Sequence, residues 1–337
     1  MKTALVILNW NGEKLLREYL PTVLKHCKNG VADVVVADNN STDNSMQTIA
    51  ELFPDLTTIP LDKNYGFAEG YNKALSQLKE YDVYILCNSD IMLKSDAVTP
   101  LINEMEKDPQ IAVVSPKIKS LLHPEDFEYA GAAGGFIDKF GYPFCRGRII
   151  NTIEQDRGQY NENSEIFWAS GAFMAVRSSV YHQLGGLDAS FFAHMEEIDF
   201  CWRAKNNGYK IAYCSNAEVF HLGGATLNQG NPRKLYLNFR NSLWMMLKNL
   251  PSNCLVIRML TRMTMDGASA LAYLLQLKPK YFWAVFKAHI ALYTNLARLW
   301  QQRKLHSIPH TKIPTGMLNG SIIWHYYVKK HKTFFPF

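Results

Sequence analysis

The first 115 residues alternate between short apolar blocks and longer amphipathic ones. Short runs rich in β-branched residues predict buried strands at Thr3–Leu8, Ala32–Ala37, Thr57–Pro60, Val83–Cys87 and Ile111–Ser115. Apolar residues at helical spacing predict helices between them, at Glu13–His26, Asp43–Leu52, Ala68–Glu80 and Asp96–Lys107. This alternation is typical of an α/β fold in which a mainly parallel, Rossmann-like sheet carries helices on both faces.

The pattern weakens over residues 120–165, where glycines and aromatic residues are frequent. We expect an irregular, partly mobile segment there, close to the functional site. Farther along, Phe167–Arg177 and Lys210–Phe220 predict strands, and Ile198–Asn206 predicts a helix between them. From Pro232 onward, long amphipathic patterns predict helices at Leu235–Leu250, Leu255–Leu277 and Lys280–Arg303.

Charge divides the chain at nearly the same place. Residues 1–232 carry a net charge of −9, whereas residues 233–337 carry +15 and contain a single acidic residue, Asp266. We therefore predict an α/β domain over residues 1–230, with halves at about 1–115 and 116–230. A basic helical region over residues 231–337 follows it.

Composition points to a reducing, cytoplasmic setting. The six cysteines form no Cys-x-x-Cys pair, and a chain of 337 residues can bury enough core to fold without disulfides. The apolar run Ala4–Leu8 is too short for a signal peptide, and polar residues follow it at once. No run of 18 uncharged apolar residues occurs, so we expect no membrane-spanning helix.

Polar clusters follow several of the predicted strands, and ligands of parallel α/β sheets bind at the carboxyl ends of strands. Asp38, at the start of Asp38–Asp43, offers a carboxylate to the imide N–H of a pyrimidine. Two glycines within Asn64–Asn72 allow close backbone approach at a helix start. Asp90, at the end of Cys87–Asp90, suits Mg²⁺ or Mn²⁺ bound together with phosphates. Each cluster alone is also compatible with a turn or a helix cap.

Further candidates lie between residues 192 and 224. Glu196, Glu197 and Asp199 are crowded in an otherwise apolar and aromatic segment, and crowded carboxylates raise one another's pKa, as a general base requires. The same acids would also suit the first turn of a helix. His221 follows an apolar strand and precedes Gly223–Gly224, which predicts a tight turn that aims it inward. A lone histidine at such a place is more often structural.

The order and spacing of these clusters resemble glycosyltransferase family 2, in its rhamnosyltransferase-like branch with the GT-A fold. The resemblance covers about residues 3–250 and is carried by VILNWNG, ADNNSTDNS, NYGFAEGYNKAL, LCNSD, WASGAFMAVRSSV, GGLDASFFAHMEEIDFCWR and VFHLGG. It implies inverting transfer of a sugar from a nucleoside-diphosphate sugar, with uridine or thymidine as the nucleoside. The implied acceptor is a hydroxyl of a glycan or polyprenyl-linked glycan in cell-surface polysaccharide synthesis.

The resemblance also implies roles for individual residues. The nucleotide-sugar site would be lined by Asn9, Asn11, Asp38, Asn64, Gly66, Asn88, Ser89, Trp168, Ser170 and Gly171, the last three shaping the sugar pocket. Asp90 would ligate Mn²⁺ or Mg²⁺, with His221 as a further ligand. Glu197 would be the catalytic base, with Glu196 and Asp199 supporting its loop or contacting the acceptor. Because Asn88 stands where the family's metal motif begins with an acid, the metal would depend more heavily on Asp90 and the diphosphate.

Three interpretations compete for residues 233–337: a helical cap on the catalytic domain, a peripheral anchor on the cytoplasmic face of the inner membrane, or a nucleic-acid-binding region. Tryptophan and tyrosine among lysine and arginine are typical of a helix at the level of lipid headgroups. No nucleic-acid motif appears, so we expect no nucleic-acid partner. The sequence predicts no particular oligomeric state.

Other functions also fit an α/β nucleotide-binding chain. A sugar nucleotidyltransferase typically has a glycine-rich, arginine-containing loop after the first strand, whereas this chain has Asn9–Gly12 there. A non-catalytic nucleotide-sugar-binding scaffold stays open because of Asn88. A dehydrogenase is disfavoured, since no Gly-x-Gly-x-x-Gly motif follows a strand.

Overall fold

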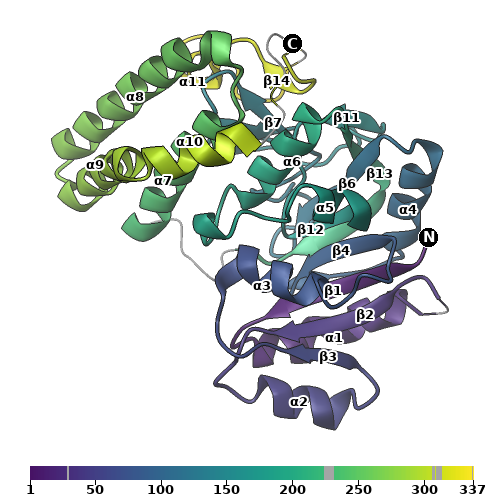
Figure 1. Ribbon diagram of the computed structural model, residues 1–337. Coiled ribbons are helices and arrows are strands. Elements are labelled where there is room, and N and C mark those ends of the chain that lie inside the picture. The colour runs from purple at the N-terminus through teal and green to yellow at the C-terminus, as the bar shows by residue number, and fades with distance from the viewer. Residues whose placement is uncertain (29, 224–230, 306–307, 309–312, 336) are drawn as a thin grey trace.

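A computed structural model of the protein (Figure 1) describes residues 1–28, 30–223, 231–305, 308, 313–335 and 337. Its central sheet has the strand order β11-β13-β6-β12-β4-β1-β2-β3, and β5 pairs with β13. These strands are β1 (Thr3–Asn9), β2 (Asp33–Asp38), β3 (Thr57–Pro60), β4 (Val83–Asn88), β5 (Ile91–Met92), β6 (Ile111–Ser120), β11 (Ser164–Ile166), β12 (Phe173–Arg177) and β13 (Lys210–His221). Strands β1 to β4 are mutually parallel, while β12 runs antiparallel between β4 and β6. The predicted mainly parallel α/β sheet is confirmed.

Helices cover both faces of this sheet because its central strands are apolar on both sides. On β1, Ala4 and Val6 belong to one hydrophobic core, which includes residues of α3 and α6. Leu5 and Ile7 point the other way, into a second core with α1 and α4. The helices of this part are α1 (Glu13–His26), α2 (Ser45–Leu52), α3 (Gly66–Leu75), α4 (Val98–Lys107), α5 (Ser178–Gln183) and α6 (Glu196–Asn206), with a 3-10 turn at Ala189–Phe191.

Residues 120–165 were expected to be irregular, and much of this segment is outside regular structure, but it also contains four complete short strands. They contribute most of a second sheet with the order β10-β9-β8-β7-β14. Its strands are β7 (Gly135–Asp138), β8 (Pro143–Cys145), β9 (Arg148–Ile149), β10 (Thr152–Ile153) and β14 (Met317–Leu318). Strands of two to four residues are too short to show an alternating pattern, and β14 reaches β7 from a distant part of the chain.

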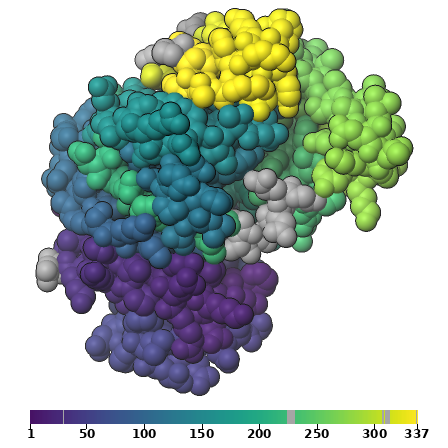
Figure 2. Space-filling view, turned by 180° about the vertical axis from the view of Figure 1, so that it is seen from behind, coloured from purple at the N-terminus to yellow at the C-terminus, as the bar shows by residue number. Residues whose placement is uncertain are grey.

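The helices predicted beyond Pro232 are present as α7 (Pro232–Asn249), α8 (Ser252–Leu275), α9 (Pro279–Thr294) and α10 (Leu296–Leu305), with α11 (Ile322–Tyr327) after them. The third predicted helix is therefore divided at Asn295. Helices α8 and α9 pack together and project from the rest of the molecule (Figures 1 and 2). Among the described residues, no helix has the length and apolar character needed to cross a membrane. The predicted boundary near residue 230 lies outside the described residues, as does Gly224.

A buried ionic cluster joins α7 to the α/β part of the chain. Asp199 on α6 has no exposed surface, and its carboxylate accepts hydrogen bonds from Arg203 at 2.8 Å, Lys248 at 3.0 Å and Asn249 at 2.8 Å. Lys248 also pairs with Asp188 at 2.6 Å. Burial alone would raise the pKa of Asp199, but the positive charges of Lys248 and Arg203 outweigh it and lower that pKa. Helix α6 is thus held in place by α7.

Replacing Lys248 with methionine keeps much of its volume but leaves Asp199 paired with Arg203 alone. Because breaking a buried ion pair exposes the remaining charge to an apolar environment, we expect Lys248→Met to lower the free energy of unfolding by about 3–5 kcal/mol. Urea denaturation followed by circular dichroism measures the change. The matched control Lys304→Met removes an exposed lysine and should change the value by less than about 0.5 kcal/mol. A Lys248→Met protein as stable as this control would contradict the role assigned to the cluster.

Candidate active site

The carboxyl ends of β1, β2 and β4 meet at one edge of the sheet and bring the predicted nucleotide residues together. In the strand register, Asn9 lies beside Asp38 and Leu8 beside Asn88. The buried carboxylate of Asp38 accepts hydrogen bonds from Asn9 Nδ2 at 2.9 Å and from Ser41 Oγ at 2.6 Å. Asn9 Oδ1 is buried and has no hydrogen-bond partner among the described residues. This oxygen faces the backbone of Gly12, so the loop after β1 packs closely on the strand end.

Side chains from three loops connect into one polar platform around that edge. Asn11 Oδ1 accepts a hydrogen bond from Thr42 N at 2.7 Å, which ties the loop after β1 to the loop after β2. Asn39 Nδ2 donates to Asn64 Oδ1 at 3.1 Å and to the Gly66 carbonyl at 3.0 Å, which adds the start of α3. Gly66 has a φ of 74°, a conformation that favours glycine. Asn39 was not among the predicted site residues, although it lies next to Asp38.

The end of β4 is linked to the segment before β12. Asn88 N donates to the Ala172 carbonyl at 2.9 Å, directly after Ser170 and Gly171. A Cβ added to Gly171 would lie 3.0 Å from the Phe67 ring and 3.7 Å from Glu197 Cβ. Gly171 therefore lies between α3 and α6, where the nucleotide platform and the predicted base approach each other. Ser89 lies on the opposite side, toward Gly12, with its Oγ 3.7 Å from the position of an added Cβ there.

Asp90 and His221 come together because β5 pairs with the end of β13. Both are buried, and His221 Nε2 lies 3.1 Å from Asp90 Oδ1. Neighbouring ligands of an octahedral Mg²⁺ at about 2.0–2.1 Å are about 3 Å apart, so this oxygen and nitrogen fit a shared divalent ion. Among the described residues, however, no group of three or more His, Cys, Asp or Glu side chains is arranged to hold a metal. Any ion at this pair needs further ligands from the donor.

Glu128 is a neighbour of this pair that the sequence did not indicate. Its carboxylate lies 3.5 Å from His221 Nδ1, and it also accepts a hydrogen bond from Ala130 N. Burial alone would lower the pKa of His221, but contacts with the carboxylates of Asp90 and Glu128 raise it to about 10, so the imidazole must lose a proton before it can ligate a metal. Glu128 lies in the segment without a periodic pattern, and its N–H donates to the Ile118 carbonyl on β6 at 3.0 Å, which places it near the paired end of β13 and His221. The sequence around a single acidic residue in such a segment does not predict which distant residue it will contact.

Two adjacent glutamates begin α6. Glu196 is buried, its Oε2 has no partner among the described residues, and burial and repulsion by Glu197 raise its pKa well above the ordinary value. Glu197 is partly exposed, and burial raises its pKa to about 7 against the opposing effect of a backbone N–H bond. A partly exposed carboxylate with this pKa is suited to accept a proton near neutral pH.

Three other predicted residues lie in the protein interior. The Trp168 ring covers Gly135 and donates from Nε1 to the Phe136 carbonyl at 2.8 Å. Ser170 is buried, and its Oγ accepts a hydrogen bond from Ala172 N at 3.3 Å. Asp199 is enclosed in the ionic cluster with α7. Trp168 and Asp199 therefore hold the surroundings of the site in place.

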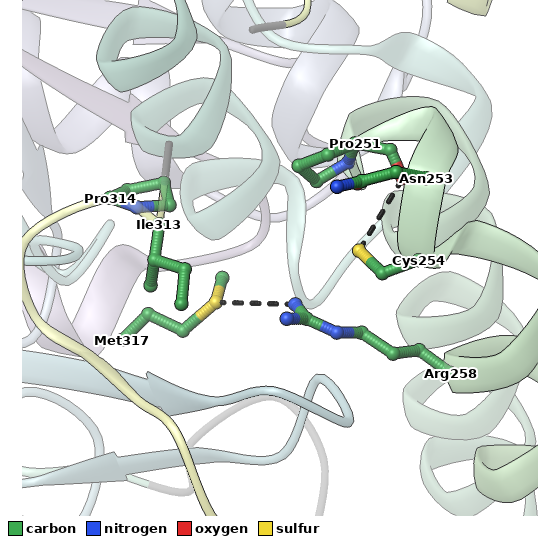
Figure 3. Close-up of a pocket in the computed structure, with 7 residues that line it drawn as sticks. All are labelled: Pro251, Asn253, Cys254, Arg258, Ile313, Pro314 and Met317. Atoms are coloured by element: carbon green, nitrogen blue, oxygen red, sulfur yellow. Dashed lines mark hydrogen bonds between the residues drawn. The ribbon is translucent and has the colours of Figure 1, made fainter. Parts of the chain in front are cut away.

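A pocket in the C-terminal part of the chain, away from the strand ends, has a different set of lining residues (Figure 3). It lies between the start of α8 and residues 313–317, where Arg258 donates to Met317 Sδ at 3.8 Å and Cys254 Sγ donates to the Pro251 carbonyl at 3.4 Å. The described residues that line it include no carboxylate and none of the candidate residues above. The strand-end site remains the candidate.

Known structures with the same architecture are glycosyltransferases of the GT-A fold. The chain is similar to GalNAc-T7 with UDP, GalNAc and Mn²⁺, with a TM-score of 0.58 and 15% identity over 75% of this chain and 48% of that one. It is also similar to S. aureus TarS 1–349 in complex with UDP-GlcNAc, with a TM-score of 0.54 and 16% identity over 90% of each chain. At these identities the likeness establishes the fold.

The chain is also similar in sequence to proteins that are named as glycosyltransferases. The chain is 27% identical to the N-acetylglucosaminyl-diphospho-decaprenol L-rhamnosyltransferase of Mycobacterium tuberculosis, over 56% of this chain and 66% of that relative. It is 24% identical to the low-salt glycan biosynthesis hexosyltransferase Agl10 of Haloferax volcanii, over 71% of this chain and 73% of that relative. The sequence model of Glycosyl transferase family 2 matches residues 4–185, more than half of the chain. Together with the fold and the strand-end site, this match means that the chain belongs to glycosyltransferase family 2.

Proposed function

We propose that this chain is an inverting glycosyltransferase that moves a sugar from a UDP- or dTDP-sugar to a hydroxyl of a glycan or polyprenyl-linked acceptor in cell-surface polysaccharide synthesis. The observation that carries the proposal is Glu197, a partly exposed carboxylate beside Gly171 whose pKa is raised to about 7. The names of the Mycobacterium and Haloferax relatives support a glycan or decaprenol-linked acceptor.

Inversion requires one in-line displacement at the anomeric carbon of the donor sugar. Glu197 accepts the proton of the acceptor hydroxyl while that oxygen bonds to the anomeric carbon and the bond to the diphosphate breaks. Asp38 and Asn9 bind the nucleoside at the strand ends, and the platform of Asn11, Asn64 and Gly66 orients it. A divalent ion held by Asp90, His221 and the donor diphosphate would neutralise charge on the departing group.

Two alternative functions, a nucleotide-sugar-binding scaffold and a sugar nucleotidyltransferase, can be distinguished from a glycosyltransferase by their products. A nucleotide-sugar-binding scaffold would bind donor without consuming it, whereas a transferase hydrolyses its donor slowly when no acceptor is present. A sugar nucleotidyltransferase would release pyrophosphate from a nucleoside triphosphate and a sugar phosphate. A thermal-shift screen of UDP- and dTDP-sugars with Mn²⁺ selects the donor, and release of UDP or dTDP from it then separates these functions.

The Glu197→Gln variant keeps the shape of the side chain and removes its ability to accept a proton. A positioned base contributes roughly 10²–10⁴-fold, so we expect nucleoside-diphosphate release to fall by at least about 100-fold while donor affinity stays within about twofold. Turnover is measured with the selected donor, and affinity by calorimetry.

Wild-type turnover should also rise as the pH passes through about 7, because the base acts only when it is deprotonated.

Glu106→Gln is the matched control, since Glu106 is an exposed glutamate on α4. Its turnover and donor affinity should equal those of the wild-type protein. A Glu197→Gln enzyme that kept a near wild-type rate would remove Glu197 as the base.

Replacing Asp90 with alanine should abolish metal-dependent turnover, because Asn88 cannot supply a second carboxylate. The additional thermal stabilisation that Mn²⁺ gives in the presence of UDP should disappear as well, which tests metal binding without catalysis. Asp55→Ala, at an exposed position after α2, is the control and should retain both properties. Mn²⁺-dependent turnover that survived in Asp90→Ala would rule out the metal assignment.

We further propose that α8 and α9 attach the enzyme to the cytoplasmic face of an anionic membrane. Exposed apolar side chains follow one side of each helix at helical spacing: Ile257, Leu260, Leu271 and Leu274 on α8, and Trp283, Phe286, Ile290 and Tyr293 on α9. Exposed Lys278, Lys280 and Lys287 lie beside them. A role as a cap explains the buried sides of both helices, such as Ala284, Val285, Ala288 and Leu292 on α9, and leaves their exposed apolar sides without a partner among the described residues.

Each basic residue near anionic lipid contributes about 1 kcal/mol, so binding should weaken as salt rises. We expect the protein to co-sediment with vesicles of anionic phospholipid and to stay in solution with neutral ones. The Leu271→Glu/Leu274→Glu variant should lose most of this binding, whereas Leu122→Glu, at an apolar residue on the α/β part that is 66% exposed, should keep it. Equal binding by the two variants would show that this face does not contact lipid.

A further inference from the structure

The loop that leads into Glu196 and Glu197 has an unusual backbone. Phe192, His194 and Met195 have φ values of 66°, 70° and 72°, in the left-handed region that residues other than glycine seldom adopt. Such conformations persist only where the surroundings enforce them, and they are concentrated at functional sites. The residue before Glu196 is thus fixed by contacts outside its own helix.

Those contacts come from α7. Asn241 has no exposed surface, and its Nδ2 lies 3.1, 2.9 and 2.7 Å from the carbonyl oxygens of Phe191, Ala193 and His194. One amide nitrogen has only two hydrogens, so the three carbonyls share them. Arg240 Nε donates to Asn241 Oδ1 at 2.8 Å, which orients the amide so that its nitrogen faces the loop.

The same loop also contacts the nucleotide platform on its other side. Phe67 N donates to the Phe192 carbonyl at 3.3 Å, and a Cβ on Gly66 would meet the Phe192 ring at 3.2 Å. Arg240 Nη2 adds a hydrogen bond to the Phe191 carbonyl at 2.8 Å. The loop therefore lies between α3, which begins at the platform, and α7, and its exit leads directly to Glu197.

We infer that Asn241, oriented by Arg240, is a positioning residue for sugar transfer: it fixes the loop of residues 191–195 so that Glu197 faces the acceptor hydroxyl. The inference rests on the proposed role of Glu197 as the base. It also means that the catalytic unit extends beyond the part matched by the family and includes α7.

The alternative is that Asn241 only packs α7 against the loop. In that case its loss lowers the melting temperature and leaves the rate constant of the folded enzyme unchanged. A positioning role predicts a lower kcat at an unchanged donor KM, because a displaced base affects the transition state and leaves donor binding intact.

The experiment compares Asn241→Ala, Asn241→Gln and the control Met246→Ala. Met246 is equally buried on α7 but packs at Gly141, away from the loop. For Asn241→Ala we expect kcat to fall by about 10–100-fold, part of what a positioned base supplies, with donor KM within about twofold. Asn241→Gln keeps the amide donors and should recover part of the rate. Met246→Ala should lower the melting temperature and leave kcat near the wild-type value.

Hydrogen–deuterium exchange of the peptide covering residues 189–197 tests the same inference without turnover. The peptide should exchange faster in Asn241→Ala than in Met246→Ala. Equal exchange in these two variants, or a kcat unchanged in Asn241→Ala, overturns the inference. If the wild-type protein turns over no donor, the proposed function fails, and the exchange comparison still decides whether Asn241 fixes the loop.

Discussion

The arrangement around the site depends on one buried charge, the carboxylate of Asp199. An ion without access to water must be paired, and only Arg203 belongs to its own helix. Lys248 and Asn249 come from α7, and Lys248 also neutralises Asp188 just before the strained loop. Packing of α7 against α6 therefore stabilises the helix on which Glu197 lies. Helix α7, the first helix of the predicted basic region, is thus packed against the α/β part through this ionic cluster.

The sequence predicted well those features that depend on local pattern. The central strands are short β-branched runs bounded by turns, and α1 begins and ends where its apolar spacing indicates. The strand-end residues Asn9, Asp38 and Asn88 could be anticipated together because parallel strands place their carboxyl ends at one edge. The nearness of Asp90 to His221 followed from the family resemblance, and the pairing of β5 with β13 explains it physically.

Features that depend on long-range contacts could not be anticipated in this way. Strands β8, β9 and β10 contain two or three residues each, and β7 pairs with β14 from residues far along the chain. Glu128 lies near His221 because its backbone is bonded to Ile118 on β6, which in turn pairs with β13. Trp168 and Asp199 belong to motifs that resemble those of the family, yet their side chains are buried, so the motif alone does not separate a supporting residue from a reacting one.

The opposite charges of the two parts of the chain give the molecule an electric dipole. The net charge of −9 belongs to residues 1–232 and the net charge of +15 to residues 233–337, which include the projecting α8 and α9 (Figure 2). A negatively charged surface attracts the basic part of the molecule and repels the acidic part. The molecule is therefore oriented before any contact forms. Since the field decays within about 8 Å at physiological ionic strength, the distant acidic end is then left free in solution. Under the proposed membrane attachment, a nucleotide sugar would approach the strand-end site from the aqueous side.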